Sequence, residues 1–110
     1  MKITKNFSLK EMTFSDTAMR RNIPNEPGIQ EVINLTALCC NILQPVRDHY
    51  GKSVRINSGY RSVKLCEAVG SSSRSQHAKG QAADFEINGL SNKELATWCY
   101  KNLDFDQIIL

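Results

Sequence analysis

A histidine and an aspartate lie close together in the stretch "SRSQHAKGQAADFEI", residues 73–87. His77 precedes Gly80, a residue that readily takes a sharp or left-handed backbone position, and Asp84 follows this turn. Ala82 and Ala83 have small side chains, so the segment between His77 and Asp84 leaves room for both groups to approach one ion. An imidazole nitrogen and a carboxylate oxygen can both bind zinc at about 2.0–2.2 Å. The spacing therefore allows a metal site or a hydrogen-bonded structural pair, and it does not decide between them.

A second candidate group is the arginine of "NSGYRS", residues 57–62, which follows a predicted strand. Gly59 would turn the chain at the end of that strand, so that Arg61 projects from a fixed edge. A guanidinium offers a planar fork of donors to a carboxylate or to a developing oxyanion. Arg61 is therefore a candidate catalytic residue. The alternative is an exposed arginine that pairs with a surface acid.

The elements before these motifs are predicted to be helical. The opening segment predicts two short helical turns, each after a serine N-cap: Leu9–Met12 after Ser8, and Asp16–Arg21 after Ser15. A long helix should follow from Ile29 to His49, because apolar residues recur there at spacings of three and four. Pro45 lies inside this pattern and predicts a kink or a break.

The remaining elements alternate between strands and helices. Alternating side chains predict strands at Ser53–Asn57 and Gln81–Ile87, and a further strand is expected at Phe105–Leu110. Helices are predicted at Ser62–Val69 and from the capping box Ser91–Glu94 to about Asn102. We therefore expect an α+β fold in which a small antiparallel sheet carries the candidate site and packs against the N-terminal helices.

Composition indicates one folded domain over residues 1–110, with 41% hydrophobic and 23% charged residues. The net charge of +3 gives little support to nucleic-acid binding. The sequence has no apolar run for membrane insertion or a signal peptide, so we expect cytoplasmic synthesis. Basic residues concentrate between positions 55 and 79: Arg55, Arg61, Lys64, Arg74 and Lys79. They form either a solvated face or a site for an anionic substrate.

The four cysteines stand at positions 39, 40, 66 and 99. No pair has the C-x-x-C spacing of a zinc knuckle or a redox site. We therefore expect all four to be buried, reduced thiols.

Together, "SGYRS" and "SQHAKGQAADF" resemble the paired signature S-G-Y-R-S and S-x-H-x-x-G-x-A-x-D of the zinc D-alanyl-D-alanine carboxypeptidase family, which also contains phage endolysin peptidases. The upstream stretches "NFSLKEMTFSDTAMRRNIPN" and "LQPVRDHYG" are similar to the lead-in helices of its small phage and prophage members. The resemblance implies a Hedgehog/DD-peptidase-like fold and a Zn2+ cofactor. It also implies hydrolysis of peptide bonds in peptidoglycan stem peptides by metal-bound water, as a D,D-carboxypeptidase or an endopeptidase.

The resemblance also implies a role for each residue at a matched position. His77 and Asp84 would be zinc ligands, and Arg61 would hold or polarise the scissile carbonyl or the substrate carboxylate. Ser75 and Tyr60 would belong to the substrate-binding part, Tyr60 in a largely architectural role.

The family's second histidine ligand and general base lie beyond the strand that Phe105–Leu110 resembles, so we expect the chain to be C-terminally incomplete. Other groups that could reach the ion have no motif behind them: His49, Glu86, Asp104 and Asp106. The alternative function is an inactive peptidase-fold module that binds cell wall or serves as a phage structural component. In either role the protein would act at the bacterial cell wall, after release by a holin or as part of a virion.

Overall fold

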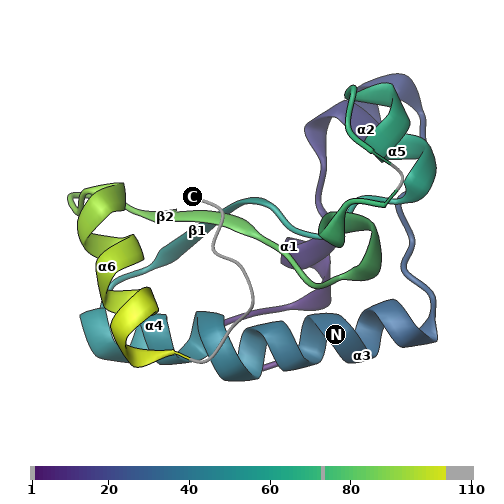
Figure 1. The fold of residues 1–110 in the computed structure, drawn as a ribbon. Coiled ribbons are helices and arrows are strands. Elements are labelled where there is room, and N and C mark those ends of the chain that lie inside the picture. Colours follow the sequence, from purple (N-terminus) through teal and green to yellow (C-terminus); the bar gives the residue numbers. More distant parts are fainter. Residues whose placement is uncertain (1, 73, 104–110) are drawn as a thin grey trace.

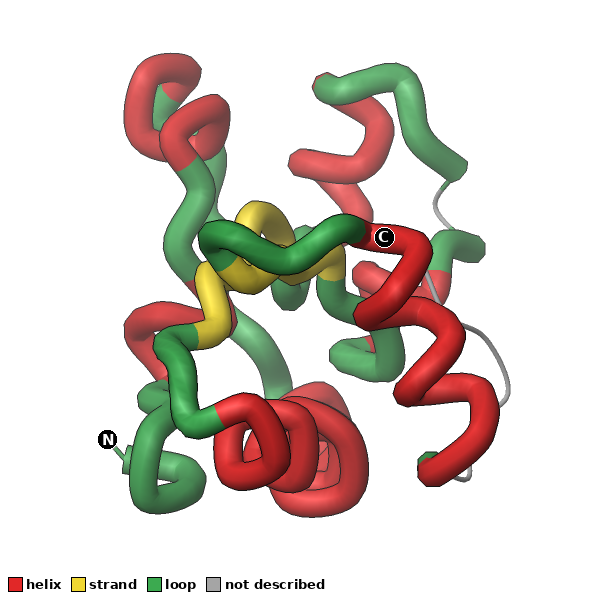
Figure 2. Tube along the Cα trace, turned by 90° about the vertical axis from the view of Figure 1, so that its left-hand side faces the viewer, coloured by secondary structure: helices red, strands yellow, loops and turns green. Residues whose placement is uncertain are grey.

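A long helix beneath a small sheet organises the fold, seen in a computed structural model that describes residues 2–72 and 74–103 (Figure 1). Viewed end-on, the helix lies below the two strands (Figure 2). Helices and a two-stranded antiparallel sheet together confirm the predicted α+β class. No helix of the described residues is long and apolar enough to cross a membrane.

The two N-terminal helices begin at the predicted serines. Helix α1 spans Leu9–Thr13, and the Ser8 hydroxyl oxygen accepts a hydrogen bond from the Glu11 amide at 3.2 Å. Helix α2 spans Asp16–Arg21, and Ser15 caps it in the same way. Each cap satisfies an amide that has no partner inside the helix.

The long helix runs from Ile29 to Tyr50 in three parts: α3 (Ile29–Leu38), the π-helical turn η1 (Cys39–Leu43) and α4 (Gln44–Tyr50). Pro45 lies in the first turn of α4 and has no N–H to donate to a carbonyl of the preceding turn. The wider turn η1 immediately precedes it and links α3 to α4. The predicted interruption at Pro45 is therefore a local π-turn in a chain that stays helical.

The sheet consists of β1 (Val54–Ser58) and β2 (Asp84–Ile87), which pair antiparallel. Arg55 lies opposite Glu86 and Ser58 opposite Asp84, with an irregularity of the β-bulge kind between Ile56 and Ser58. Asp84 and Glu86 are two positions apart on β2, so their side chains share a face of the sheet. Because cross-strand partners also share a face, the bulge brings Ser58 to the side of Arg55. A regular strand would turn them to opposite sides.

Three further elements complete the described fold: α5 (Val63–Ala68), the 3₁₀ turn η2 (Gln76–Lys79) and α6 (Asn92–Asn102). Both predicted helices are thus present, within a residue or so of their expected bounds. The strand predicted at Gln81–Ile87 is shorter, because only its second half pairs with β1. The strand predicted at Phe105–Leu110 lies outside the described residues.

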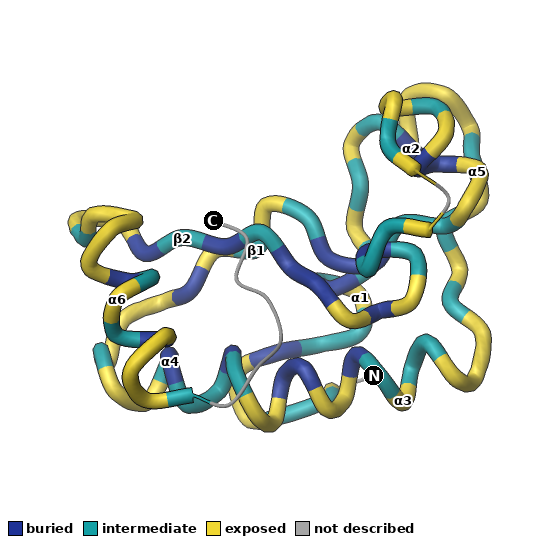
Figure 3. Tube along the Cα trace, in the orientation of Figure 1, coloured by how far each residue is buried: buried dark blue, intermediate teal, exposed yellow. Residues whose placement is uncertain are grey.

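The core lies between the long helix and the sheet, and both elements carry buried residues, dark blue in Figure 3. Leu35 and Val46 of the long helix are fully buried, and Phe85 and Ile87 of β2 belong to the same cluster. From α6, Leu95 and Cys99 join it. Burying such side chains supplies about 1.5–3 kcal/mol each and holds the strand ends in place.

The cysteine prediction is correct for three residues and wrong for one. Cys39, Cys66 and Cys99 are buried, and Cys40 is exposed. Cys40 follows Cys39 by one helical position, about 100° around the helix, so only one of the two can face the core. Burial raises the pKa of the Cys39 thiol to about 12 and that of Cys99 to about 11.

We predict that a thiol reagent at pH 8 modifies one cysteine rapidly in the folded protein and all four after unfolding. The reagent attacks thiolates, and a raised pKa leaves Cys39 and Cys99 protonated until the pH exceeds these values. Absorbance of the released chromophore measures the two phases. Cys40→Ser should remove the rapid phase, and a persisting rapid phase in that variant would contradict the burial pattern.

Candidate active site

The two motif segments meet at the end of the sheet where the bulge lies. The Gly59 carbonyl oxygen is 2.7 Å from His77 Nδ1, in a buried contact between residues 18 positions apart. The Arg61 amide donates to the His77 carbonyl oxygen at 3.1 Å. One backbone and one side-chain hydrogen bond therefore fix the arginine motif against the histidine motif.

Two glycines make this arrangement possible because helices approach them closely. A Cβ atom at Gly59 would collide with the backbone carbonyl of Met12 at the end of α1. Gly80 has φ of 73° and would bring a Cβ to 2.6 Å from the carbonyl oxygen of Glu31 in α3. The predicted left-handed position at Gly80 is confirmed, and it ends η2 against the long helix.

His77 lies in η2 with its ring buried, 5% exposed. When Nδ1 carries the proton it donates to the Gly59 carbonyl, and this leaves the Nε2 lone pair free. Nε2 is 3.6 Å from Asp84 Oδ2. The hydrogen bond thus orients the ring so that its unprotonated nitrogen faces the carboxylate, as is usual for metal-binding histidines.

Asp84, the first residue of β2, has two differently placed carboxylate oxygens. Oδ2 faces both His77 and Arg61, whose Nη2 is 3.4 Å away. Oδ1 is buried and has no hydrogen-bond partner among the described residues. A buried carboxylate oxygen without a partner is costly and calls for a cation or a donor.

Arg61 is held at a second point by a residue that sequence reasoning missed. Its Nε donates to the Ser58 hydroxyl oxygen at 2.8 Å. With Nη2 directed at Asp84, the guanidinium is anchored along one side and keeps N–H donors on Nη1. The bulge places Ser58 there, and no side-chain pattern in the sequence indicates it.

The two predicted substrate-binding residues lie in different surroundings. Ser75 is half-buried and caps η2: its hydroxyl oxygen accepts from the His77 amide at 3.2 Å, which leaves the hydroxyl proton free to donate. Tyr60 is buried in the core cluster, and burial raises the pKa of its phenol. Tyr60 therefore lies where an architectural role is expected.

Asn25 was also missed, although it connects the N-terminal segment to the arginine motif. Its amide nitrogen donates to the carbonyl oxygens of Thr13 at 2.8 Å and of Tyr60 at 3.0 Å. Its amide oxygen accepts from the Ser62 amide at 2.7 Å. An asparagine between two prolines predicts only a turn, so the sequence gives no signal for this role.

The groups considered as further ligands lie elsewhere or outside the described part. His49 stacks on Trp98 of α6 with ring centroids 4.3 Å apart, at the end of the long helix away from η2 (Figure 1). Glu86 faces Arg55, with Oε1 of the glutamate 4.0 Å from Nε of the arginine. Asp104 and Asp106 are outside the described residues.

Cys66 lies near the arginine motif but is poorly suited to act as a nucleophile. It is buried, and its Sγ contacts the Arg61 carbonyl oxygen at 3.6 Å. Burial raises the pKa of this thiol, although the Arg61 charge opposes the shift. The neutral thiol packs as an apolar group.

His77 and Asp84 fit zinc as two members of a ligand set. They offer one nitrogen and one carboxylate group, a mixture that zinc accepts, and the unpartnered Oδ1 gives a reason for a cation there. Within residues 2–72 and 74–103, no group of three or more His, Cys, Asp or Glu side chains is arranged to hold a metal ion.

Comparison with known families agrees with this geometry. The family model of peptidase M15 matches residues 5–109, so the chain belongs to the peptidase M15 family. The resemblance inferred from the two motifs is confirmed, and membership indicates peptidase activity. Searches of curated proteins and of solved structures found no match.

We predict that Asn25→Ala lowers the free energy of unfolding by about 2 kcal/mol, because three hydrogen bonds of about 0.5–1.5 kcal/mol each are lost. Urea denaturation measures the change. Asn41→Ala is the matched control: Asn41 is exposed on η1, and its loss should change stability by less than about 0.5 kcal/mol. Equal losses in both variants would show that the Asn25 contacts contribute nothing specific.

We predict that zinc raises the melting temperature of the protein and that EDTA reverses the rise. A ligand at 100 times its dissociation constant stabilises by about 2.7 kcal/mol, which corresponds to roughly 10 °C for a domain of this size. His77→Ala and Asp84→Asn should each abolish the zinc-dependent rise in calorimetry. Glu67→Gln, an exposed carboxylate on α5, should keep it. A rise that survives in both site variants would place zinc elsewhere.

Proposed function

We propose that this peptidase binds zinc through His77 and Asp84 and hydrolyses peptide bonds in peptidoglycan stem peptides. The observation that carries the proposal is the buried, unpartnered Oδ1 of Asp84 beside an imidazole whose Nε2 lone pair faces the same carboxylate. Such a pair is costly as a structural contact and well suited to a divalent cation. The second family motif, "SQHAKGQAADF", supplies both residues.

Bound zinc would supply a Lewis acid and lower the pKa of a water molecule toward neutrality. The chain's own part is to present the two ligands in a fixed geometry. The Gly59 carbonyl holds the His77 ring, and pairing with β1 holds Asp84 at the strand end. Because hydrogen bonds fix both side chains before a metal binds, little reorganisation is needed.

Arg61 would bind the scissile carbonyl or the substrate carboxylate. Its Nε and Nη2 are engaged by Ser58 and Asp84, so the guanidinium plane is fixed while Nη1 stays free. A preorganised donor of this kind stabilises developing negative charge without moving. The free hydroxyl proton of Ser75 could donate to the substrate beside His77.

The proposed substrate places the action at the bacterial cell wall, which the protein would reach after release by a holin or within a virion. Both an end-group D,D-carboxypeptidase and an internal endopeptidase are compatible with these residue roles. The products distinguish the two, because a carboxypeptidase releases a single D-alanine.

The second candidate function is a module that binds cell wall without cleaving it. The observation in its favour is the Arg61–Asp84 ion pair at 3.4 Å, in which a protein cation already faces the proposed ligand carboxylate. In that case the pair would be structural, and zinc would not be required.

The test is incubation of purified stem peptides with the zinc-supplemented protein, followed by mass spectrometry of the products. We expect cleavage by the wild type and by Glu67→Gln, and none by His77→Ala or Asp84→Asn. Arg61→Gln should lower kcat by about 10²–10³, the usual cost of a lost oxyanion donor. If the wild type binds stem peptides without cleaving them, the binding module is the correct reading.

A further inference from the structure

A groove of about 630 Å³ opens next to the candidate site. Its walls come from the turn between α1 and α2, from α2, from β1 and from α5, and Arg61 belongs to both the groove and the site. The groove is therefore continuous with the place where the peptide bond would lie.

The groove is basic. Three arginines and one aspartate line it: Arg20, Arg55, Arg61 and Asp16. Arg55 is 79% exposed in its side chain and reaches Glu86 only at 4.0 Å. Arg20 pairs with Asp16 at 3.4 Å, with both side chains open to solvent. Exposed pairs of this kind contribute little, so the donors of Arg55 and Arg20 remain available to a ligand.

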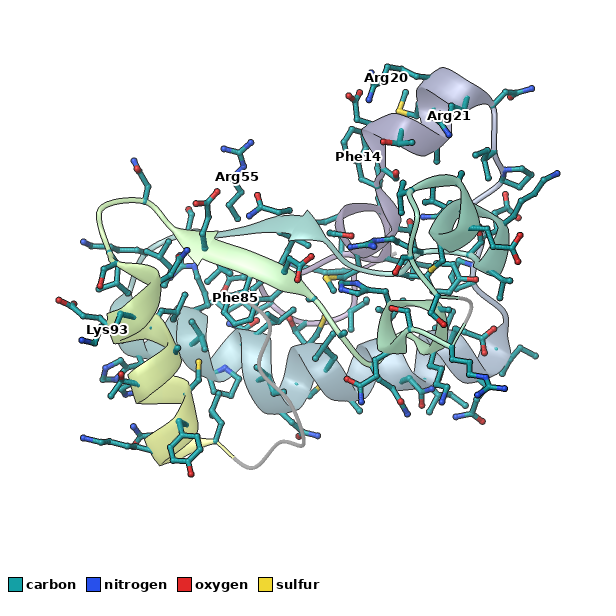
Figure 4. The ribbon with its side chains drawn as sticks, turned by 45° about the horizontal axis from the view of Figure 1, so that its top comes forward. Phe14, Arg20, Arg21, Arg55, Phe85 and Lys93 are labelled. Carbon is teal, nitrogen blue, oxygen red and sulfur yellow. The ribbon has the colours of Figure 1, made fainter. Side chains whose placement is uncertain are left out.

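The other part of the lining is apolar. Phe14 is 57% exposed on the α1 side of the groove, and Leu65 of α5 and Val69, the residue after α5, also line it. Figure 4 shows Arg55 rising from β1 on the side where Phe14 and Arg20 lie. A ligand in the groove would thus meet both a charged and an apolar surface.

The β-bulge makes the charged surface continuous with the site. It brings Arg55 and Ser58 to the same face of the sheet, and Ser58 holds Arg61. Ser58 is three positions after Arg55 on the strand, which corresponds to roughly 10 Å. An extended peptide covers that distance in about three residues.

We propose that this groove binds an acidic, extended peptide, with a substrate carboxylate about three residues from the reacting end paired to Arg55 and a neighbouring apolar group against Phe14. Arg55 and Phe14 are then specificity-determining residues. The inference rests on the proposed function, because it places the reacting end of the peptide at Arg61.

The test compares two fluorescent pentapeptides that end in D-Ala-D-Ala and carry either glutamate or glutamine at the second position. Fluorescence anisotropy measures their affinity for the metal-free protein at low salt. We expect the glutamate peptide to bind about 3–5-fold more tightly, the range of one exposed ion pair. The difference in affinity should disappear in Arg55→Gln. It should shrink in 1 M salt, because the Debye length is then about 3 Å and exposed charges are screened.

Lys93→Gln is the matched control, because Lys93 is an exposed lysine on α6, away from the groove (Figure 4). It should keep the preference for glutamate. Equal affinity of the two peptides for the wild type would overturn the proposal, as would an equal loss in Lys93→Gln, which would indicate general charge attraction. Equally strong binding of a short single-stranded DNA would overturn it in favour of unspecific polyanion binding.

This binding measurement needs neither zinc nor hydrolysis, so it separates the two proposals. A protein that prefers the glutamate peptide but cleaves nothing would support the proposed peptide groove and contradict the proposed enzymatic function. A protein that binds both peptides with equal affinity and cleaves them equally well would support the proposed function and contradict the role of the groove.

Discussion

The buried hydrogen bond between the Gly59 carbonyl and His77 is the contact on which the site depends. It joins two segments that are separated in sequence, and it selects the ring nitrogen that faces Asp84. This hydrogen bond requires that the backbone of each segment lies close to a helix: Gly59 lies against the end of α1, and Gly80 lies against α3. The helices thus set the geometry of the site through backbone contact, with the glycines as the points of approach.

The sheet adds the second constraint. Pairing of β1 with β2 fixes where Asp84 emerges, and the bulge turns Ser58 to the same side. From there Ser58 orients Arg61, so that three charged or polar groups converge without a long loop. A two-stranded sheet has little stability of its own, and its register is held by the apolar face that packs on the long helix.

Much of this architecture follows from local sequence. Serine caps and a three-and-four apolar spacing are short-range signals, so α1, α2 and the long helix are predicted closely. The convergence of His77 with Asp84 was also expected, because a turn at Gly80 joins them. The bulge, the Asn25 contacts and the exposure of Cys40 were not, because they depend on how distant segments pack. The alternating pattern predicted a strand from Gln81, but the first three residues of that range have no partner on β1.

The ion pair between Arg61 and Asp84 has a consequence for assembly of the protein. A guanidinium beside the carboxylate balances its charge from the moment the strand pairs, so folding does not leave an isolated anion in a half-buried place. In the proposed enzyme a metal would therefore bind to a chain that has already folded, while Ser58 keeps the guanidinium in the same orientation. Folding would thus come first, and loading of the inorganic partner second.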